Sequence, residues 1–306
     1  MKAVRIHAYG EPEVLRFEEA PDPTPGPDEV VVDVRAAGIN PLDWKIRSGA
    51  LAGLMPLPLP AILGWDIAGV VASTGAAAAD FRPGDAVFGM IPIGRPGAYA
   101  ERAILPESAL AALPQELTPT EAAAVPVVGL AAHQLVNGLG DLRSGQTALV
   151  LGAAGNVGRL CLALAALRDA HVWAAATARD LEQADLPAGV RQFATDEDGL
   201  DTASPSVDLL IDTVGGPLLE RAIAWVRPGG RVVSTVQPPQ IPGGMEVEGH
   251  MLQVAPDRAA LEQLGQLFAE GHLPLPQITT YRLPEAAQAH ATAAAGQAGK
   301  LVLVVP

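Results

Sequence analysis

The chain has 306 residues, of which 49% are hydrophobic and only 4% aromatic, and its formal net charge is −14. This length allows two domains and a large core filled mainly by alanine, valine and leucine. There is no uninterrupted apolar run of about eighteen residues, so we expect no membrane span. An acidic surface disfavours binding to nucleic acid or anionic membranes. The single cysteine, Cys161, excludes an internal disulfide and suits a reducing cytoplasm, where we expect the protein to reside.

Residues 1 to about 115 are predicted to be rich in β-strands. Apolar or alternating stretches, separated by glycine, proline or aspartate, mark strands at residues 1–8, 29–37, 67–73, 86–90 and 98–105. Short strands with frequent turns indicate a small barrel or a pair of sheets. An extended, proline-punctuated loop is expected at residues 54–64, and a helix at residues 119–141.

A glycine-rich turn follows a predicted buried strand in the segment TALVLGAAGNVG, residues 147–158. Gly152, Gly155 and Gly158 lie three residues apart, and residues 156–169 have the apolar spacing of a helix. A strand, a turn with little side-chain bulk and a helix N-terminus together suit a pyrophosphate, because the backbone can approach the phosphates and the helix N–H groups point at them. The spacing GxxGxxG departs from the usual GxGxxG, so the alternative is a tight turn that holds no ligand.

Strands and helices alternate after this turn. A second strand at residues 171–176 completes a βαβ unit of about 30 residues. The further elements predicted are strands at 207–212, 231–236 and 300–305, helices at 217–226, 257–270 and 284–296, and a turn at 227–230. Nearly continuous apolar strands that alternate with helices indicate a parallel sheet covered on both faces.

Nine short motifs run through almost the whole chain. They are AAGINPLDWKIRSG at 36–49, PAILGWDIAGVV at 60–71, FRPGDAVFGM at 81–90, GAYAER at 97–102, EAAAVPVVGLAAHQL at 121–135, GAAGNVG at 152–158, VDLLIDTVGG at 207–216, RPGGRVVS at 227–234 and GKLVLVV at 299–305. In this order they resemble the medium-chain dehydrogenase/reductase superfamily, in particular its zinc-independent, quinone oxidoreductase-like branch.

The resemblance implies an α/β fold with two domains. A GroES-like β-barrel domain is expected at residues 1–118, completed by 272–306, and a Rossmann domain with a doubly wound parallel sheet at 119–271. The resemblance also implies NADPH as cofactor, a quinone or an α,β-unsaturated carbonyl compound as substrate, and a homodimer.

Zinc-dependent relatives need cysteine and histidine ligands. Where they carry a cysteine after the Gly-Ile pair this chain has Asn40, and where they carry Gly-His-Glu it has Gly64, Trp65 and Asp66. The six histidines are scattered and form no HxxxH pair. We therefore expect no metal site.

The glycine-rich turn supplies the candidate pyrophosphate ligands. They are Gly152, Ala153, Gly155, Asn156, Val157 and Gly158. Asn156 stands where the family usually has glycine, and it would add a hydrogen bond or, if its φ had to be positive, crowd the turn.

The end of the second Rossmann strand distinguishes NAD from NADP. NAD enzymes place a carboxylate there, about 20 residues beyond the glycines, to bind the ribose 2′-hydroxyl. This strand end carries no carboxylate, and Thr177 and Arg179 suit a 2′-phosphate, which arginine can meet with two hydrogen bonds. Asp180 partly neutralises Arg179, so a solvated loop arginine is the alternative.

Further candidates come from the sheet edge and the C-terminus. By resemblance, Thr213 and Val214 approach the nicotinamide, while Asp212 also suits a helix cap. Thr235 and Lys300 are further cofactor candidates, although Lys300 also suits a strand edge.

The segment INPLDWKIRSG faces the nicotinamide and the substrate in the family. Asn40 is expected to donate to a substrate carbonyl or to hold the nicotinamide ribose, and Lys45 to polarise the oxygen that gains negative charge. Asp43 is the third catalytic candidate. The alternative is that Asn40 and Pro41 form a turn and Asp43 caps a short helix. No tyrosine lies near position 45, so the proton is expected to come from water.

Together these features predict an NADPH-dependent, zinc-independent reductase of quinones or α,β-unsaturated carbonyls. The cofactor carries the reactivity, and the protein supplies orientation and electrostatic support. The alternative is an NADPH-binding redox sensor or adaptor with little turnover, which the missing tyrosine and the asparagine at 156 keep open.

Overall fold

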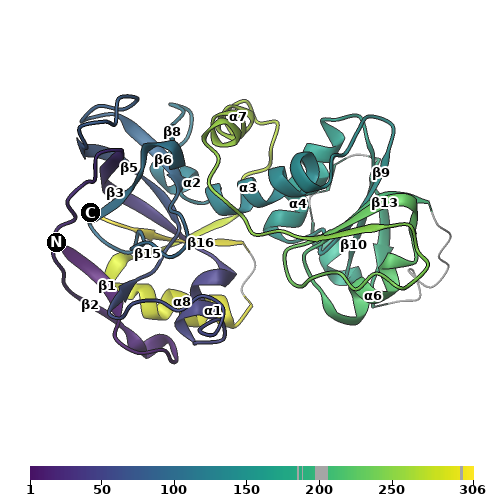
Figure 1. Cartoon of the computed structure of the whole chain (residues 1–306), viewed down its shortest axis with the longest axis horizontal. Helices are drawn as coiled ribbons and strands as arrows, with labels where there is room; N and C mark the ends of the chain where they lie inside the picture. Colours follow the sequence, from purple (N-terminus) through teal and green to yellow (C-terminus); the bar gives the residue numbers. More distant parts are fainter. Residues whose placement is uncertain (185, 188, 197–205, 297–298) are drawn as a thin grey trace. The chain divides into compact units, whose positions relative to one another are not determined.

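A computed structural model of the chain describes residues 1–184, 186–187, 189–196, 206–296 and 299–306 (Figure 1). Its internal contacts form two compact units. Unit 1 contains Met1–Val127, Ala255–Gly271 and Leu275–Pro306, and unit 2 contains Val128–Val254 and His272–Pro274. Residues 119–127 and 255–271 thus pack with unit 1, whereas the expected domain borders assigned them to the Rossmann domain.

Unit 1 contains two sheets. The smaller has the order β2-β1-β4, and the larger has the order β15-β16-β3-β5-β6-β8 with β7 paired to β3. Their strands are β1 (Lys2–Ile6), β2 (Leu15–Glu19), β3 (Glu29–Ile39), β4 (Ala61–Ile62), β5 (Asp66–Thr74), β6 (Ala86–Met90), β7 (Arg102–Pro106), β8 (Leu110–Ala112), β15 (Ile278–Arg282) and β16 (Lys300–Val304). The C-terminal strand β16 therefore lies inside the N-terminal sheet, antiparallel to β3.

The core of unit 1 is built from the apolar faces of these strands. All four valines of β3 are buried, and Trp65, Phe88 and Tyr99 are the largest side chains that the unit encloses completely. Within its described residues the unit also contains the α-helices α1 (Pro41–Arg47), α2 (Pro119–Ala122), α7 (Arg258–Ala269) and α8 (Ala286–Ala294). Helix α7 begins as predicted, because the Asp257 side chain accepts a hydrogen bond from the backbone N–H of Ala260.

Two sequence expectations for this half are corrected. The single helix expected at 119–141 is wrong: α2 ends at Ala122, α3 spans Pro126–His133, and a π-helical turn follows at Gln134–Leu139. Pro126 lacks an N–H and disfavours helical φ/ψ at Val125, which breaks the run. The strand expected at 98–105 begins only at Arg102.

Unit 2 is built around one six-stranded parallel sheet in the order β11-β10-β9-β12-β13-β14. The strands are β9 (Thr147–Leu151), β10 (His171–Ala176), β11 (Arg191–Ala194), β12 (Val207–Asp212), β13 (Val226–Ser234) and β14 (Glu248–Met251). In chain order this is 3-2-1-4-5-6, the order of a doubly wound dinucleotide-binding fold. The predicted α/β class and Rossmann sheet are confirmed.

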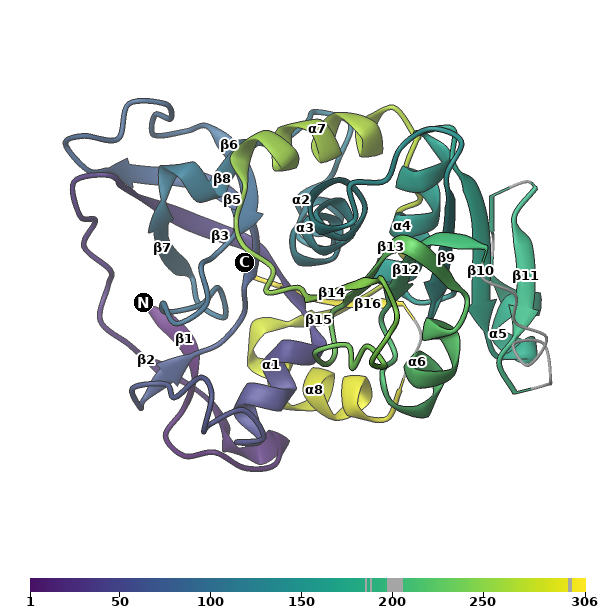
Figure 2. The ribbon, with the colours of Figure 1, turned by 45° about the vertical axis from the view of Figure 1, so that its right-hand side comes forward.

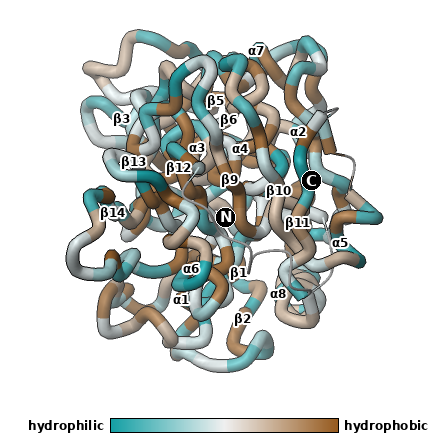
Figure 3. Tube along the Cα trace, turned by 90° about the vertical axis from the view of Figure 1, so that its right-hand side faces the viewer, coloured by the Kyte–Doolittle hydropathy of each residue, from teal (hydrophilic) through white to brown (hydrophobic). Residues whose placement is uncertain are grey.

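Helices α4 (Asn156–Ala166), α5 (Ala178–Gln183) and α6 (Gly216–Ile223) cover this sheet. Helix α4 packs on β9 and β10, and α6 on β12 and β13 (Figure 2). Residues Ala148–Leu151 of β9 are fully buried because helices lie against both faces, and the tube around β9 is largely hydrophobic in Figure 3. The predicted turn at 227–230 bulges out of β13, where Val226 and then Arg231 pair with β12.

Candidate functional site

The turn between β9 and α4 has no room for side chains at two of its glycines. Gly152 has a φ of +74°, and a Cβ there would lie 2.3 Å from Thr213 Oγ1. A Cβ on Gly158 would lie 2.2 Å from the Gly152 carbonyl oxygen. These contacts explain why the segment needs glycine at both positions.

The first turn of α4 is left open by its N-cap residue. Gly155 is the N-cap and offers no side-chain hydrogen bond to the helix N–H groups. Asn156 is the first helical residue, and the non-glycine residues with positive φ in the described ranges are Asp141 and Asp169. The asparagine therefore does not strain the backbone of the turn. Bare glycines and uncapped helix N–H groups fit the pyrophosphate of a dinucleotide.

The carboxyl ends of β9 and β12 meet beside this turn. Thr213 Oγ1 donates to the carbonyl oxygen of Leu151 at 2.8 Å, which ties the two strand ends together. Val214 follows with 48% of its surface exposed. The strand order reverses between β9 and β12, and ligands of open α/β sheets bind at such a point.

Asp212 holds the loop that carries Thr213 and Val214. Its Oδ1 accepts the N–H groups of Val214 at 3.0 Å and of Gly215 at 2.8 Å, and its Oδ2 accepts the Ser234 hydroxyl at 2.6 Å. The side chain is completely buried, so it shapes the loop from within. Thr235 Oγ1 lies 3.5 Å from the Asp212 carbonyl oxygen, at the end of β13.

The turn after β10 brings together the residues expected to bind the 2′-phosphate. Thr177 caps α5, and its Oγ1 accepts the N–H of Asp180 at 3.1 Å. Arg179 is exposed and makes no hydrogen bond or ion pair within the part of the chain that the structure describes. Asp196, from beyond the end of β11, accepts the N–H of Ala178 at 2.8 Å. A carboxylate therefore does lie at the end of β10, although it comes from another strand.

In unit 1, three polar residues from separate segments meet in a buried cluster. Lys300 Nζ donates to Asn40 Oδ1 at 2.5 Å and to Asp66 Oδ2 at 2.7 Å, and Asn40 Nδ2 donates to the same carboxylate oxygen at 2.8 Å. Lys300 is 2% exposed and Asp66 0%. The antiparallel pairing of β16 with β3 brings Lys300 to Asn40, because Leu301 pairs with Ile39.

Asp43 lies beside this cluster, in the first turn of α1. Its Oδ2 accepts the backbone N–H of Asn40 at 2.7 Å, so the short helix considered as an alternative is present. Complete burial raises the pKa of the Asp43 carboxyl to about 7; the hydrogen bond from Asn40 opposes the shift, and the negative charge of Asp66 adds to it. Lys45 is exposed on the same helix, and the structure does not bring it to the cluster.

Sequence reasoning missed a second buried polar group in unit 1. His290 Nε2 lies 3.2 Å from the Tyr99 hydroxyl, and both side chains are completely buried. Burial lowers the pKa of His290 to about 3, with a smaller contribution from the charge of Arg47. Burial and then the charge of Asp43 raise the pKa of Tyr99. These residues come from distant segments, and no short motif links them.

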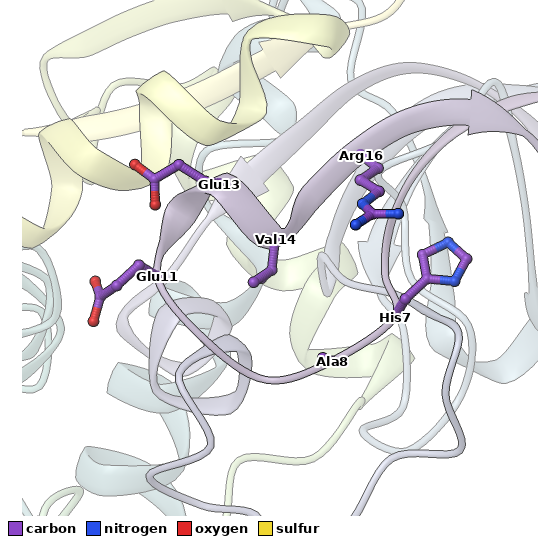
Figure 4. Close-up of a pocket in the computed structure, with 6 residues that line it drawn as sticks. All are labelled: His7, Ala8, Glu11, Glu13, Val14 and Arg16. Atoms are coloured by element: carbon purple, nitrogen blue, oxygen red, sulfur yellow. The ribbon is translucent and has the colours of Figure 1, made fainter.

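Other candidates have structural roles or lie on the surface. Cys161 is buried in α4, where burial raises its thiol pKa, as expected for a packing residue. A surface hollow of about 320 Å³ in unit 1 is lined by His7, Ala8, Glu11, Glu13, Val14 and Arg16 (Figure 4).

Among the described residues no three His, Cys, Asp or Glu side chains group as metal ligands. None of the described helices is long and apolar enough to cross a membrane.

Comparison with known proteins places the chain in a family. The family profile "Alcohol dehydrogenase GroES-like domain" matches residues 26–115, and "Zinc-binding dehydrogenase" matches residues 188–303. "NAD(P)H oxidoreductase RTN4IP1, mitochondrial" from Danio rerio is 31% identical over 267 residues, which cover 78% of this chain and 67% of that protein. This chain belongs to the medium-chain dehydrogenase/reductase superfamily.

Within the superfamily the chain groups with the quinone oxidoreductase-like branch, as its motifs predicted. "Quinone-oxidoreductase homolog, chloroplastic" from Spinacia oleracea is 37% identical over 60% of this chain, and the match spans 57% of that relative's length. The solved structure of the quinone oxidoreductase from Coxiella burnetii has a TM-score of 0.86 and 28% sequence identity, and the match covers 100% of this chain and 99% of that one.

Proposed function

We propose that this member of the superfamily is an NADPH-dependent, zinc-independent oxidoreductase that reduces quinones or α,β-unsaturated carbonyl compounds. The observation that carries the proposal is the β9–α4 turn, where Gly152 and Gly158 exclude a Cβ and the helix N–H groups are left uncapped. The names of the spinach and zebrafish relatives support a quinone-type acceptor and a nicotinamide cofactor.

The residues of unit 2 would hold the cofactor along the carboxyl edge of the sheet. The turn from Gly152 to Gly158 binds the pyrophosphate, and Arg179 with Thr177 binds the 2′-phosphate. Thr213, Val214 and Thr235 lie at strand ends near the switch point, on the nicotinamide side. A bound NADPH supplies the hydride, and the protein supplies its orientation.

In unit 1 we assign Asn40 to contact the substrate carbonyl or the nicotinamide ribose. Lys300 and Asp66 fix the orientation of its amide, which leaves one Nδ2 hydrogen free to donate. Lys300 is therefore proposed to act on the cofactor through Asn40, as a positioning residue. Asp43 holds the backbone of Asn40, and exposed Lys45 is available to stabilise negative charge on the acceptor oxygen.

Zinc independence rests on the side chains at the usual ligand positions. Asn40 and the completely buried Trp65 stand where zinc enzymes have a cysteine and a histidine, and Asn40 is already bonded to Asp66 and Lys300. Elemental analysis of the purified protein is expected to find no stoichiometric zinc; one zinc per chain would overturn this part of the proposal.

A cytoplasmic homodimer remains part of the proposal. Support for the dimer comes from the family resemblance, and support for the cytoplasm from the single buried cysteine. Size-exclusion chromatography with light scattering tests the dimer directly, and a monomeric mass would contradict it.

The proposed activity is tested by NADPH oxidation with a panel of quinones and enals, together with fluorescence titration of both nucleotides. We expect turnover on at least one acceptor, NADPH affinity at least about tenfold above that for NADH, and loss of most of that difference in Arg179→Ala. Equal affinities would refute the Arg179 assignment. Tight NADPH binding without turnover on any acceptor would instead favour the sensor or adaptor.

A further inference from the structure

A carboxylate from an unexpected strand lies where the cofactor ribose is expected. Asp196 Oδ1 accepts the N–H of Ala178 at 2.8 Å. Ala178 is two residues beyond Ala176, the last residue of β10. The end of this second strand is where Rossmann proteins distinguish a ribose 2′-hydroxyl from a 2′-phosphate.

The parallel pairing of β10 and β11 explains this position. Ala176 pairs with Ala194, so the residues two beyond each, Ala178 and Asp196, meet as the strands end. The ladder continues one step further, because the N–H of Thr195 donates to the Ala176 carbonyl oxygen at 2.9 Å. Arg221 Nη2 lies 3.5 Å from the Thr195 carbonyl oxygen. Asp196 therefore belongs to the sheet edge, and its position follows from the register.

The groups around the 2′-position then have opposing charges. Arg179 is exposed and free of hydrogen bonds and ion pairs among the described residues, so it can meet a phosphate. Asp196 occupies the Ala178 N–H that a phosphate would otherwise use, and it adds a negative charge beside it. Thr177 Oγ1 accepts the N–H of Asp180, and its hydroxyl hydrogen remains available to donate to a phosphate. A phosphate there gains Arg179 as a cation but faces the exposed carboxylates of Asp180 and Asp196.

We propose that Asp196 is a specificity-determining residue for the cofactor, which opposes Arg179 and favours a ribose with a free 2′-hydroxyl. The inference rests on the proposed function, since it assigns a residue to the cofactor site of that function. The ratio of NADPH to NADH affinity is then smaller than it would be with Arg179 and no Asp196. Removal of the Asp196 charge increases this ratio. A carboxylate can also accept a hydrogen bond from the ribose 2′-hydroxyl of NADH. The ionised 2′-phosphate of NADPH has no hydrogen to donate and cannot form this bond.

The test is Asp196→Asn, because an asparagine Oδ1 can still accept the Ala178 N–H while the charge is removed. Calorimetric titration measures the affinities of NADPH and NADH and of the fragments 2′,5′-ADP and 5′-AMP. We expect Asp196→Asn to bind NADPH and 2′,5′-ADP about tenfold more tightly, with NADH and 5′-AMP unchanged or weaker. The gain should shrink in concentrated salt, because the side chain is exposed and salt screens its charge.

Asp180→Asn is the matched control, because it removes an equal charge from the same turn without touching the Ala178 N–H. An equal gain in both variants would show a general field effect and overturn the inference. An unchanged NADPH/NADH ratio in Asp196→Asn would overturn it as well, while leaving the proposed function intact. Failure of the wild type to bind either nucleotide would instead overturn the proposed function, and this inference with it.

Discussion

Among single residues, Asp66 and Lys300 form a buried ion pair that also orients Asn40. Lys300→Met would leave the Asp66 carboxylate buried and without its cation, at a cost of about 3–5 kcal/mol in the free energy of unfolding, measured in urea. The control is the double variant Asp66→Asn/Lys300→Met, in which neither member of the pair carries a charge and the asparagine can still accept the Val127 N–H. We expect it to recover much of the loss. A double variant no more stable than the single one would contradict this account of the pair.

Asp43 makes folding stability depend on pH. Its pKa rises from an ordinary value of 3.8 to about 7 in the native state, so the native protein binds the proton more tightly than the unfolded chain. The resulting stabilisation is complete below pH 3.8 and is lost as the pH rises through about 7. Relative to Asp43→Asn, the wild type should therefore lose more than about 1 kcal/mol between pH 5 and pH 8, as measured by urea unfolding at each pH. A difference between the two proteins that is independent of pH would contradict the assignment.

The same residues show how far a sequence can specify a site. Asn40, Asp43 and Lys300 are all recognisable as polar residues in family motifs. Their meeting depends on the pairing of β16 with β3, across 260 residues, and no local pattern records it. Asp196 was overlooked for the same reason, because it enters the cofactor turn through the register of β11. Tyr99 and His290 meet only through packing of the core.

Among the elements, the β9–α4 turn has glycines with two different roles: Gly158 is required by packing, and Gly155 leaves space for the phosphates. A Cβ on Gly158 would lie 2.2 Å from the Gly152 carbonyl oxygen, whereas a Cβ on Gly155 would lie 3.3 Å from that oxygen. Gly158→Ala should therefore shift the turn and destabilise the fold. Gly155→Ala should fold with nearly wild-type stability but bind NADPH more weakly, because the methyl group stands at the exposed N-cap where the phosphates approach.

Thermal unfolding and NADPH titration of the two variants check this distinction. A Gly158→Ala protein as stable as the wild type would show that the turn tolerates a side chain there. Unaltered NADPH affinity in Gly155→Ala would place the pyrophosphate elsewhere.

Secondary-structure elements could be predicted from the sequence where their burial requires a run of apolar residues. The apolar strands β6, β10 and β12 begin and end at the predicted residues, because both of their faces are largely buried. Strands β14 and β15 contain no fully buried residue and carry no comparable pattern, and they were missed. The helix expected at 119–141 failed at Pro126, where a proline inside an alanine- and valine-rich run was given too little weight.

For the whole molecule, composition and motif order indicated the superfamily and both folds. The unit borders were less predictable, because α7 follows the last Rossmann strand in the chain yet packs with unit 1. Gly265 of α7 lies close to Phe88 and Pro114, where a Cβ would come within 3.1 Å of the Phe88 ring and 3.2 Å of Pro114. Such a contact depends on three-dimensional packing, which neighbouring residues in the sequence do not reveal.

The central claim is that the bare turn between β9 and α4 binds the diphosphate of a nicotinamide dinucleotide. A crystal structure of the protein with NADPH tests it most directly. The account predicts phosphate oxygens within hydrogen-bond distance of backbone N–H groups between Gly152 and Gly158. An empty turn, or a nucleotide bound at another place in saturating NADPH, would contradict it.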